Sequence, residues 1–117
     1  KKIDPKIRLN DIWVATHINN GALDRSDKLL QIEMSLKTMQ LMGSDGCNSI
    51  RAKINDISET NLSFGNLMAT KKMCPNMEVS DQFNNALAIV TSYKFKDLEL
   101  SLYDQEGQEL LRFLKAD

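Results

Sequence analysis

Hydrophobic and polar residues alternate with a period of two along most of the chain, which is the pattern of strands with one buried and one exposed face. The segments of this kind are predicted as strands: residues 12–18, 30–36, 38–44, 50–54, 98–103 and 109–114. The predicted faces of the first strand are Ile12, Val14, Thr16 and Ile18 on one side and Trp13, Ala15 and His17 on the other. This pattern favours antiparallel sheets, because parallel sheets are usually buried on both faces.

Turn-forming residues separate these segments. Residues 19–21 (Asn-Asn-Gly) follow the first predicted strand, and Asn-Gly supplies the positive φ that tight turns need. Residues 104–107 precede the last strand and place Gly107 at the left-handed position. Residues 43–46 are also predicted as a turn, because they lack the Gly-Lys-Ser/Thr ending of a phosphate-binding loop.

Residues 78–90 depart from the period of two. Their hydrophobic members fall on one helical stripe, which consists of Val79, Phe83, Ala86, Leu87 and Val90. Pro75 lies just ahead, where proline suits the start of a helix. A single helix before the last strands predicts an α+β fold, in which a strongly curved antiparallel sheet or incomplete β-barrel packs on one main helix. No linker or repeat divides the chain, so a single domain is predicted.

Composition narrows the function classes. The chain has 117 residues, 42% of them hydrophobic, with only 2 Pro and 5 Gly, which indicates a folded domain and not a disordered segment. Its net charge of −1 gives no general attraction to nucleic acid or anionic membranes. Lys71 and Lys72 with Arg51 and Lys53 form at most a small basic patch with few aromatic residues, so no nucleic-acid partner is expected. No run of about 18 apolar residues occurs, so no membrane-spanning helix is expected either.

Candidate catalytic and metal-binding residues are few. His17 is the single histidine, and the sequence supplies no partner with an assigned role, so a His on a sheet face is the simpler interpretation. Residues 104–107 lack the remaining ligands of a calcium loop. Cys47 and Cys74 are too few for a zinc site and are compatible with one disulfide or with two free thiols. We therefore expect no enzyme activity, no metal and no cofactor.

Methionine is frequent, with 6 residues in the chain. Its adaptable side chain fills cores, and it also lines cavities that accept apolar ligands. The second interpretation predicts a pocket for an acyl chain or another apolar ligand between the sheet and the helix. Its lining would include Met34, Met42, Phe83 and Leu87.

Several short motifs occur in an order that resembles a known family. A Gly-Cys-Asn turn is followed by a Thr-x-x-x-Cys segment ahead of the helix, and the chain closes with a Leu-x-Leu-x-Asp-x-x-Gly-x-x-Leu-Leu-x-Phe hairpin. The motif residues, with a tryptophan in the opening strand, are Trp13, Gly46, Cys47, Asn48, Thr70, Met73 and Cys74. Over residues 9–114 this order resembles the META domain, the HslJ-like family of bacterial envelope lipoproteins.

The resemblance implies a location and a role. The domain would comprise residues 9–117, and residues 1–8 would be an N-terminal tail, the remnant of a linker after a removed signal or lipid anchor outside this sequence. Family members are secreted or lipid-anchored in the periplasm or outer membrane, are linked to stress, and have no established enzymatic activity. We expect a monomeric, non-catalytic domain of the bacterial cell envelope that binds an envelope protein. The alternative is an apolar-ligand barrel, because the family fold is similar to a pilot lipoprotein that holds lipid.

The resemblance also assigns roles to the motif residues. An oxidising envelope compartment favours a disulfide between Cys47 and Cys74. In this interpretation the motif is structural: Gly46 sets the turn, Asn48 satisfies its backbone, and Cys47 links it to the start of the helix. A direct binding role for the same residues is the alternative.

Overall fold

The computed structural model describes residues 5–23, 30–75 and 77–116. The helices of these ranges are α1 (Pro5–Arg8) and α2 (Glu78–Ala88). The strands are β1 (Ile12–Ile18), β2 (Gly21–Ala22), β3 (Leu30–Ser35), β4 (Gln40–Asp45), β5 (Ser49–Ile57), β6 (Leu62–Phe64), β7 (Met68–Ala69), β8 (Ser92–Lys96), β9 (Glu99–Tyr103) and β10 (Glu109–Lys115).

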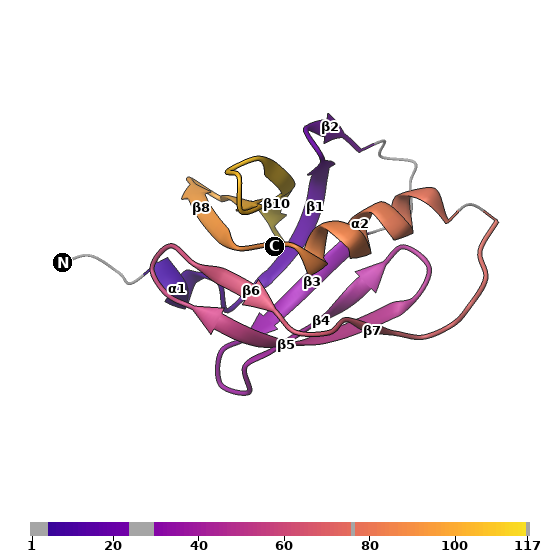
Figure 1. Ribbon diagram of the computed structural model, residues 1–117, viewed down its shortest axis with the longest axis horizontal. Coiled ribbons are helices and arrows are strands. Elements are labelled where there is room, and N and C mark those ends of the chain that lie inside the picture. Colours follow the sequence, from indigo (N-terminus) through magenta and orange to yellow (C-terminus); the bar gives the residue numbers. More distant parts are fainter. Residues whose placement is uncertain (1–4, 24–29, 76, 117) are drawn as a thin grey trace.

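The strands form one antiparallel sheet that curls into a nearly closed barrel (Figure 1). Its order is β6-β5-β4-β3-β1-β10-β9-β8, while β2 pairs with β1 and β7 pairs with β5. At the seam between β6 and β8, the described residues meet at an isolated bridge between Asn61 and Ser92. Two backbone bonds flank this bridge, from Leu62 N–H to Thr91 O (3.1 Å) and from Tyr93 N–H to Thr60 O (3.0 Å). The predicted incomplete barrel with one main helix is confirmed.

The faces predicted for the first strand are wrong beyond its midpoint. Trp13 and Ala15 point into the core, as expected for one face of a strand. The pairing of β1 with β10 then shifts register between Ala15 and His17, and Ile18 is buried in place of His17. The cause is a bulge, which adds one residue to one strand and exchanges the two faces beyond it.

The other alternating segments form strands, but two bounds differ from the prediction. The segment predicted as a strand over residues 38–44 is β4, which begins at Gln40 because residues 36–39 form a turn in which Met39 has φ +55°. Residues 43–45, predicted as part of a turn, belong to β4, and the turn begins at Gly46.

β3 buries every second residue, and β5 does so from Ile50 to Ile54. The Asn-Asn-Gly turn joins β1 to β2 with positive φ at Asn19 and Asn20. Asp104 and Gly107 close the turn before β10, where Asp104 Oδ1 accepts the N–H groups of Glu106 and Gln108 at 2.9 Å each. Gly107 has φ +83°, as the turn prediction requires.

The last residues of the predicted tail form a short helix. Pro5–Arg8 form α1, and the Arg8 guanidinium lies 4.1 Å from the centre of the Phe95 ring and donates to Asp97 O at 2.6 Å. Leu9, the next residue, is fully buried. Arg8 therefore contacts the folded domain, whereas residues 1–4 of the predicted tail lie outside the described ranges.

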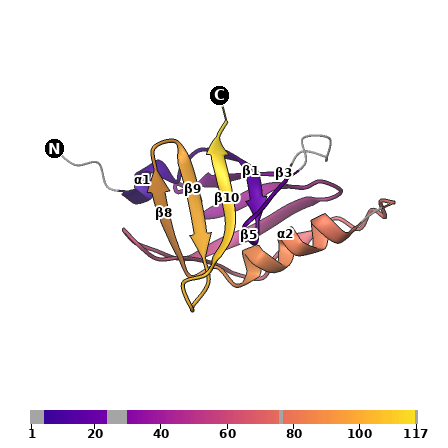
Figure 2. The same cartoon turned by 90° about the horizontal axis from the view of Figure 1, so that it is seen from above.

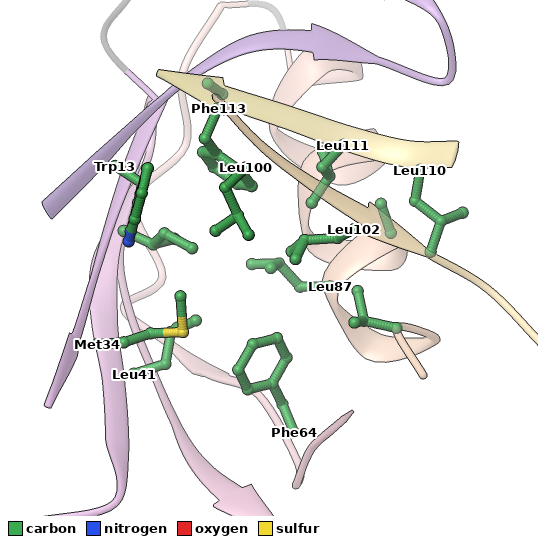
Figure 3. Close-up of a cluster of buried hydrophobic side chains, with 14 of the residues drawn as sticks. Trp13, Met34, Leu41, Phe64, Leu87, Leu100, Leu102, Leu110, Leu111 and Phe113 are labelled. Carbon is green, nitrogen blue, oxygen red and sulfur yellow. The ribbon is translucent and has the colours of Figure 1, made fainter. Parts of the chain in front are cut away.

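Helix α2 packs against the inner face of the curved sheet and contributes side chains to the hydrophobic core. It contacts β1, β4, β6 and β10, strands from both halves of the sheet (Figure 2). The buried side of α2 carries Ser80, Phe83, Ala86 and Leu87. Figure 3 shows Leu87 among side chains of the strands, and Phe83 packs edge-on against Phe113 with 6.1 Å between ring centres. Within the described ranges, neither helix is long and apolar enough to cross a membrane.

Gly43 leaves no room for a side chain where β4 pairs with β3. It pairs with Ile32 across β3 and β4, and a Cβ atom added there would clash with Gln31 O and lie 2.9 Å from the Ile32 Cα. Both neighbours are backbone atoms, so they move only if the sheet moves. We therefore expect Gly43→Ala to lower the free energy of unfolding by about 1–3 kcal/mol in urea titrations. Gly21→Ala is the matched control, because its nearest neighbour would be 3.4 Å away, and equal stability of both variants would contradict the prediction.

Candidate functional site

A buried aspartate organises the turn between β4 and β5. Asp45 is 1% exposed, and its Oδ1 accepts the backbone N–H groups of Cys47 (2.8 Å) and Asn48 (2.6 Å). Gly46 between them has φ +92°, a conformation that glycine adopts without strain. A carboxylate that accepts backbone N–H groups in this way fixes the turn and is itself stabilised although it is buried.

The same aspartate ties this turn to α2. Its second carboxylate oxygen, Oδ2, accepts the Nδ2 amide of Asn84 at 2.7 Å, and its backbone oxygen accepts the Ser80 hydroxyl at 2.7 Å. Ser80 is 4% exposed and lies on the buried side of the helix. The Gly-Cys-Asn turn and the helix are therefore joined by polar contacts as well as by the apolar core.

Asn48 connects the turn to the segment that follows β7. Its Oδ1 accepts the Thr70 hydroxyl (2.8 Å) and the Lys72 N–H (2.7 Å), while its Nδ2 donates to Lys72 O (3.3 Å). The Thr70 hydroxyl oxygen also accepts the N–H of Ser49 at 3.1 Å. Asn48 is 6% exposed, so these contacts occupy its amide group in a largely buried place. They hold residues 70–72 alongside the start of β5.

Cys47 and Cys74 form a disulfide, which confirms the pairing expected from the family resemblance. The bond links the turn to the chain just ahead of α2. Between these attachments, Met73 is 86% exposed. The sulfur bridge and Asn48 thus fix the backbone of a segment whose side chains face solvent.

Exposed methionines lie in a groove beside this segment. Met42, Arg51 and Met68 pair across β4, β5 and β7, and the two methionines are 37% and 62% exposed. A hollow of about 420 Å³ lies over this row and adjoins a second one of about 750 Å³ between β5 and the chain after β6. We call this surface the β7 groove and define it by Met42, Arg51, Lys53, Leu67, Met68 and Thr70.

The β7 groove is positively charged. Its lining contains Arg51 and Lys53 and no carboxylate, and Lys71 and Lys72 continue the chain directly beyond Thr70. Within residues 5–23, 30–75 and 77–116, these four side chains have no ion-pair partner. The nearest carboxylate in the pairing row is Glu33, on the far side of Met42. Two cations of the small basic patch expected from the sequence, Arg51 and Lys53, therefore lie beside the exposed methionines, and Lys71 and Lys72 follow along the chain.

The remaining polar candidates lie elsewhere. His17 faces Arg112 of β10, and its Nδ1 lies 2.8 Å from the hydroxyl of Thr16. In the part of the chain that the structure describes, no three His, Cys, Asp or Glu side chains gather in a way that suits a metal ion.

The family model for the META domain matches residues 7–117. The chain belongs to the META domain family. Two solved NMR structures share the fold. One, of a protein from Burkholderia xenovorans, has a TM-score of 0.71 and 21% identity over 99% of this chain and 92% of that chain. The other has a TM-score of 0.70 and 19% identity over 97% of this chain and 96% of that chain. No curated protein matches the chain.

The motif residues of this META domain fall into two places. Those of the turn and the Thr-x-x-x-Cys segment come together around Asn48 and the disulfide, as described above. Trp13 lies in the core instead, where it is 2% exposed, donates its indole N–H to Leu9 O at 3.2 Å and stacks 5.7 Å from Phe95. The family motif therefore contains one core residue, Trp13, and a group of residues that join the Gly-Cys-Asn turn to the segment ahead of α2.

The residues predicted to line an apolar pocket do not share one cavity in this META domain. Met34, Phe83 and Leu87 are at most 1% exposed and belong to the packed core. Met42 is on the outer face of β4 and lines the β7 groove. Met34 lies opposite the buried Leu41 on the paired strands β3 and β4, and Met42, the next residue of β4, points to the other face.

Sequence reasoning missed the polar partners of the turn. Asp45 has a local signal, because an Asp that precedes Cys47 and Asn48 by two and three residues suits a side-chain-to-backbone turn. Ser80 and Asn84 have no such signal, since they lie 35 and 39 residues away along the chain.

Proposed function

We propose that this META domain is a non-catalytic binding module of the bacterial cell envelope, exported or lipid-anchored, that recognises another envelope protein through the β7 groove and serves the envelope under stress. The observation that carries the proposal is the exposure of Met68 and Met73 on a segment fixed by the Cys47–Cys74 disulfide. Exposed methionines adapt to the shape of a partner, and a fixed backbone reduces the entropy lost on binding. A disulfide persists in oxidising compartments such as the periplasm.

The polar side chains of Asp45 and Asn48 are engaged in structural hydrogen bonds, which supports binding over catalysis. Both carboxylate oxygens of Asp45 and the amide of Asn48 are engaged by neighbouring backbone and side-chain groups. These contacts fix the turn and the segment after β7, and they leave the apolar and cationic side chains of the groove as the groups that face a partner. Buried networks of this kind rigidify a surface.

Site-specific photo-crosslinking in the native host tests the proposal. A benzophenone amino acid replaces Met68 in one variant and the exposed Lys94 of β8, at the other end of the sheet order, in the control. We expect a discrete protein adduct from the Met68 variant in the envelope fraction and none from the Lys94 variant. No adduct, or the same adducts from both positions, would contradict the proposal.

The same experiment separates the alternatives for location and ligand. Mass spectrometry of the Met68 adduct distinguishes a protein partner from an acyl chain or phospholipid, and a lipid adduct would replace the protein-binding module by the apolar-ligand barrel. Alkylation of thiols before lysis reports the compartment. Recovery of the chain in the cytoplasm with both thiols alkylated would overturn the envelope assignment.

A further inference from the structure

One edge of the sheet is open beside the β7 groove. β7 pairs with β5 along one side, with Met68 opposite Arg51 and Ala69 opposite Ile50. The Thr70 N–H donates to Ser49 O at 3.0 Å, so the backbone groups of Thr70 face β5. Successive residues of a strand direct their N–H and C=O groups to opposite sides. The backbone groups of Ala69 therefore point away from the sheet, and those of Leu67 and Lys71 follow the same alternation.

These outward groups are free to bind a further strand. Among the described residues, the N–H groups of Leu67 and Lys71 have no hydrogen-bond partner, and Ala69 and Lys71 are exposed. Figure 1 shows β7 at the border of the sheet, beside β5. An unpaired strand edge is a template for another strand. The contacts of Asn48 with Lys72 and the disulfide keep this edge extended and in place.

The side chains around the edge specify the chemistry of that strand. Arg51 and Lys53 of β5 lie beside this edge, and Lys71 and Lys72 lie along the chain at its end. None of the four has an ion-pair partner in the described chain, so acidic side chains complement them. Met68 is exposed next to Arg51 and offers apolar contact to a side chain on the same face of an added strand. Single-stranded nucleic acid fits less well, because it needs stacking on aromatic rings and the only aromatic ring of the lining, Phe64, is 8% exposed.

We propose that the partner of this domain presents an extended, acidic peptide segment, which pairs as an additional strand with the open edge at residues 67–71. The inference rests on the proposed function, since it names the part of the partner that the β7 groove binds. Main-chain hydrogen bonds supply affinity in this mode of recognition, and alternate side chains supply selectivity.

Titration of the isotope-labelled full chain with synthetic peptides tests the proposal. The probe is a short peptide of alternating Glu and Val. One control replaces Glu by Lys, and a second keeps the acidic sequence but carries N-methyl groups on alternate backbone nitrogens, which removes the donors of one edge. We expect amide shifts at residues 67–73 with the probe, no shifts with the Lys peptide, and binding about tenfold or more weaker for one of the two N-methylation registers.

Two variants probe the edge and its charge separately. Ala69→Pro removes the outward N–H and leaves the bond between Thr70 and Ser49 intact, and proline is tolerated on edge strands. We expect this variant to keep its disulfide and its amide spectrum and to bind the probe about tenfold more weakly. Lys71→Glu/Lys72→Glu is expected to weaken binding in low salt, whereas Lys94→Glu/Lys96→Glu on β8 is the matched control without effect.

The outcomes separate this inference from the proposed function. Equal affinity of the probe for Ala69→Pro and the native chain, or equal affinity of all acidic peptides, would leave a charge patch and overturn strand addition. Preferential binding to phosphatidylglycerol vesicles, or self-association through this edge, would overturn it in favour of a membrane surface or a second copy. If the Met68 crosslink forms in the host and survives Ala69→Pro, the proposed function stands and the strand-addition inference fails.

Discussion

Replacing Phe83 by alanine is expected to lower the free energy of unfolding by about 3–5 kcal/mol. Phe83 is fully buried and contacts Phe113 of β10 edge-on, so the substitution removes apolar contacts, leaves a cavity and deletes one aromatic pair. Equilibrium unfolding in urea, followed by circular dichroism, measures the change. Phe83→Leu should lose less, because it fills part of the cavity.

Gln82 provides the control for this prediction. It precedes Phe83 on α2 and is exposed, so Gln82→Ala changes the same turn of the helix without a cavity. We expect its free energy of unfolding to stay within about 0.5 kcal/mol of the native value. A Phe83→Ala protein as stable as Gln82→Ala would show that α2 does not complete the core.

The loss of Phe83 should also reach the Gly-Cys-Asn turn. The flanking residues Ser80 and Asn84 donate to Asp45, whose carboxylate in turn accepts the N–H groups of Cys47 and Asn48. A helix that is packed less firmly opens these contacts more often. Hydrogen exchange at the two turn amides is therefore expected to accelerate in Phe83→Ala and to remain slow in Gln82→Ala.

The sequence pattern predicts those strands in which every second residue is buried. β3 and β9 satisfy this condition, as does β5 up to Ile54, and the helical stripe of α2 is equally regular. β1 fails it, because the bulge after Ala15 exchanges its faces. A bulge depends on the partner strand, so the residues of β1 alone do not reveal it.

Short strands leave too little pattern to be recognised. β6 and β7 have three and two residues, and both owe their conformation to pairing with β5. Tertiary pairing decides these two elements. β8 is longer and does alternate, since Tyr93 is buried, Phe95 is half-buried, and Lys94 and Lys96 are exposed, so its pattern was available in the sequence and was not recognised.

The candidate site was predictable only in part, because its surface also depends on how the strands pair. The family motif indicates Cys47, Asn48, Thr70 and Cys74, and the structure brings them together. The β7 groove depends on the pairing of Arg51 with Met68, and its open edge depends on the direction of the Ala69 backbone groups. Neither follows from composition or periodicity, since both are consequences of register.

Removal of the disulfide is the second large effect that we expect. Cys47 and Cys74 are 27 residues apart, so their bond restricts the unfolded chain and contributes roughly 3–4 kcal/mol by chain-entropy arithmetic. Cys47→Ser/Cys74→Ser should lose about this much of the free energy of unfolding without reductant. The double variant is preferable to Cys47→Ser alone, because it leaves no unpaired thiol that forms dimers.

Reductant provides the control, because it removes the bond without changing the side-chain set. We expect the native chain with reductant to match the double variant, and reductant to leave the double variant unchanged. If the native chain and the double variant unfold at the same urea concentration without reductant, the bond does not stabilise the fold. The contacts of Asn48 with Thr70 and Lys72 remain in the double variant, so the amide shifts of residues 70–72 should change less than those of residues 73–75. Equal changes in both stretches would mean that the disulfide, and not Asn48, positions the segment beside the β7 groove.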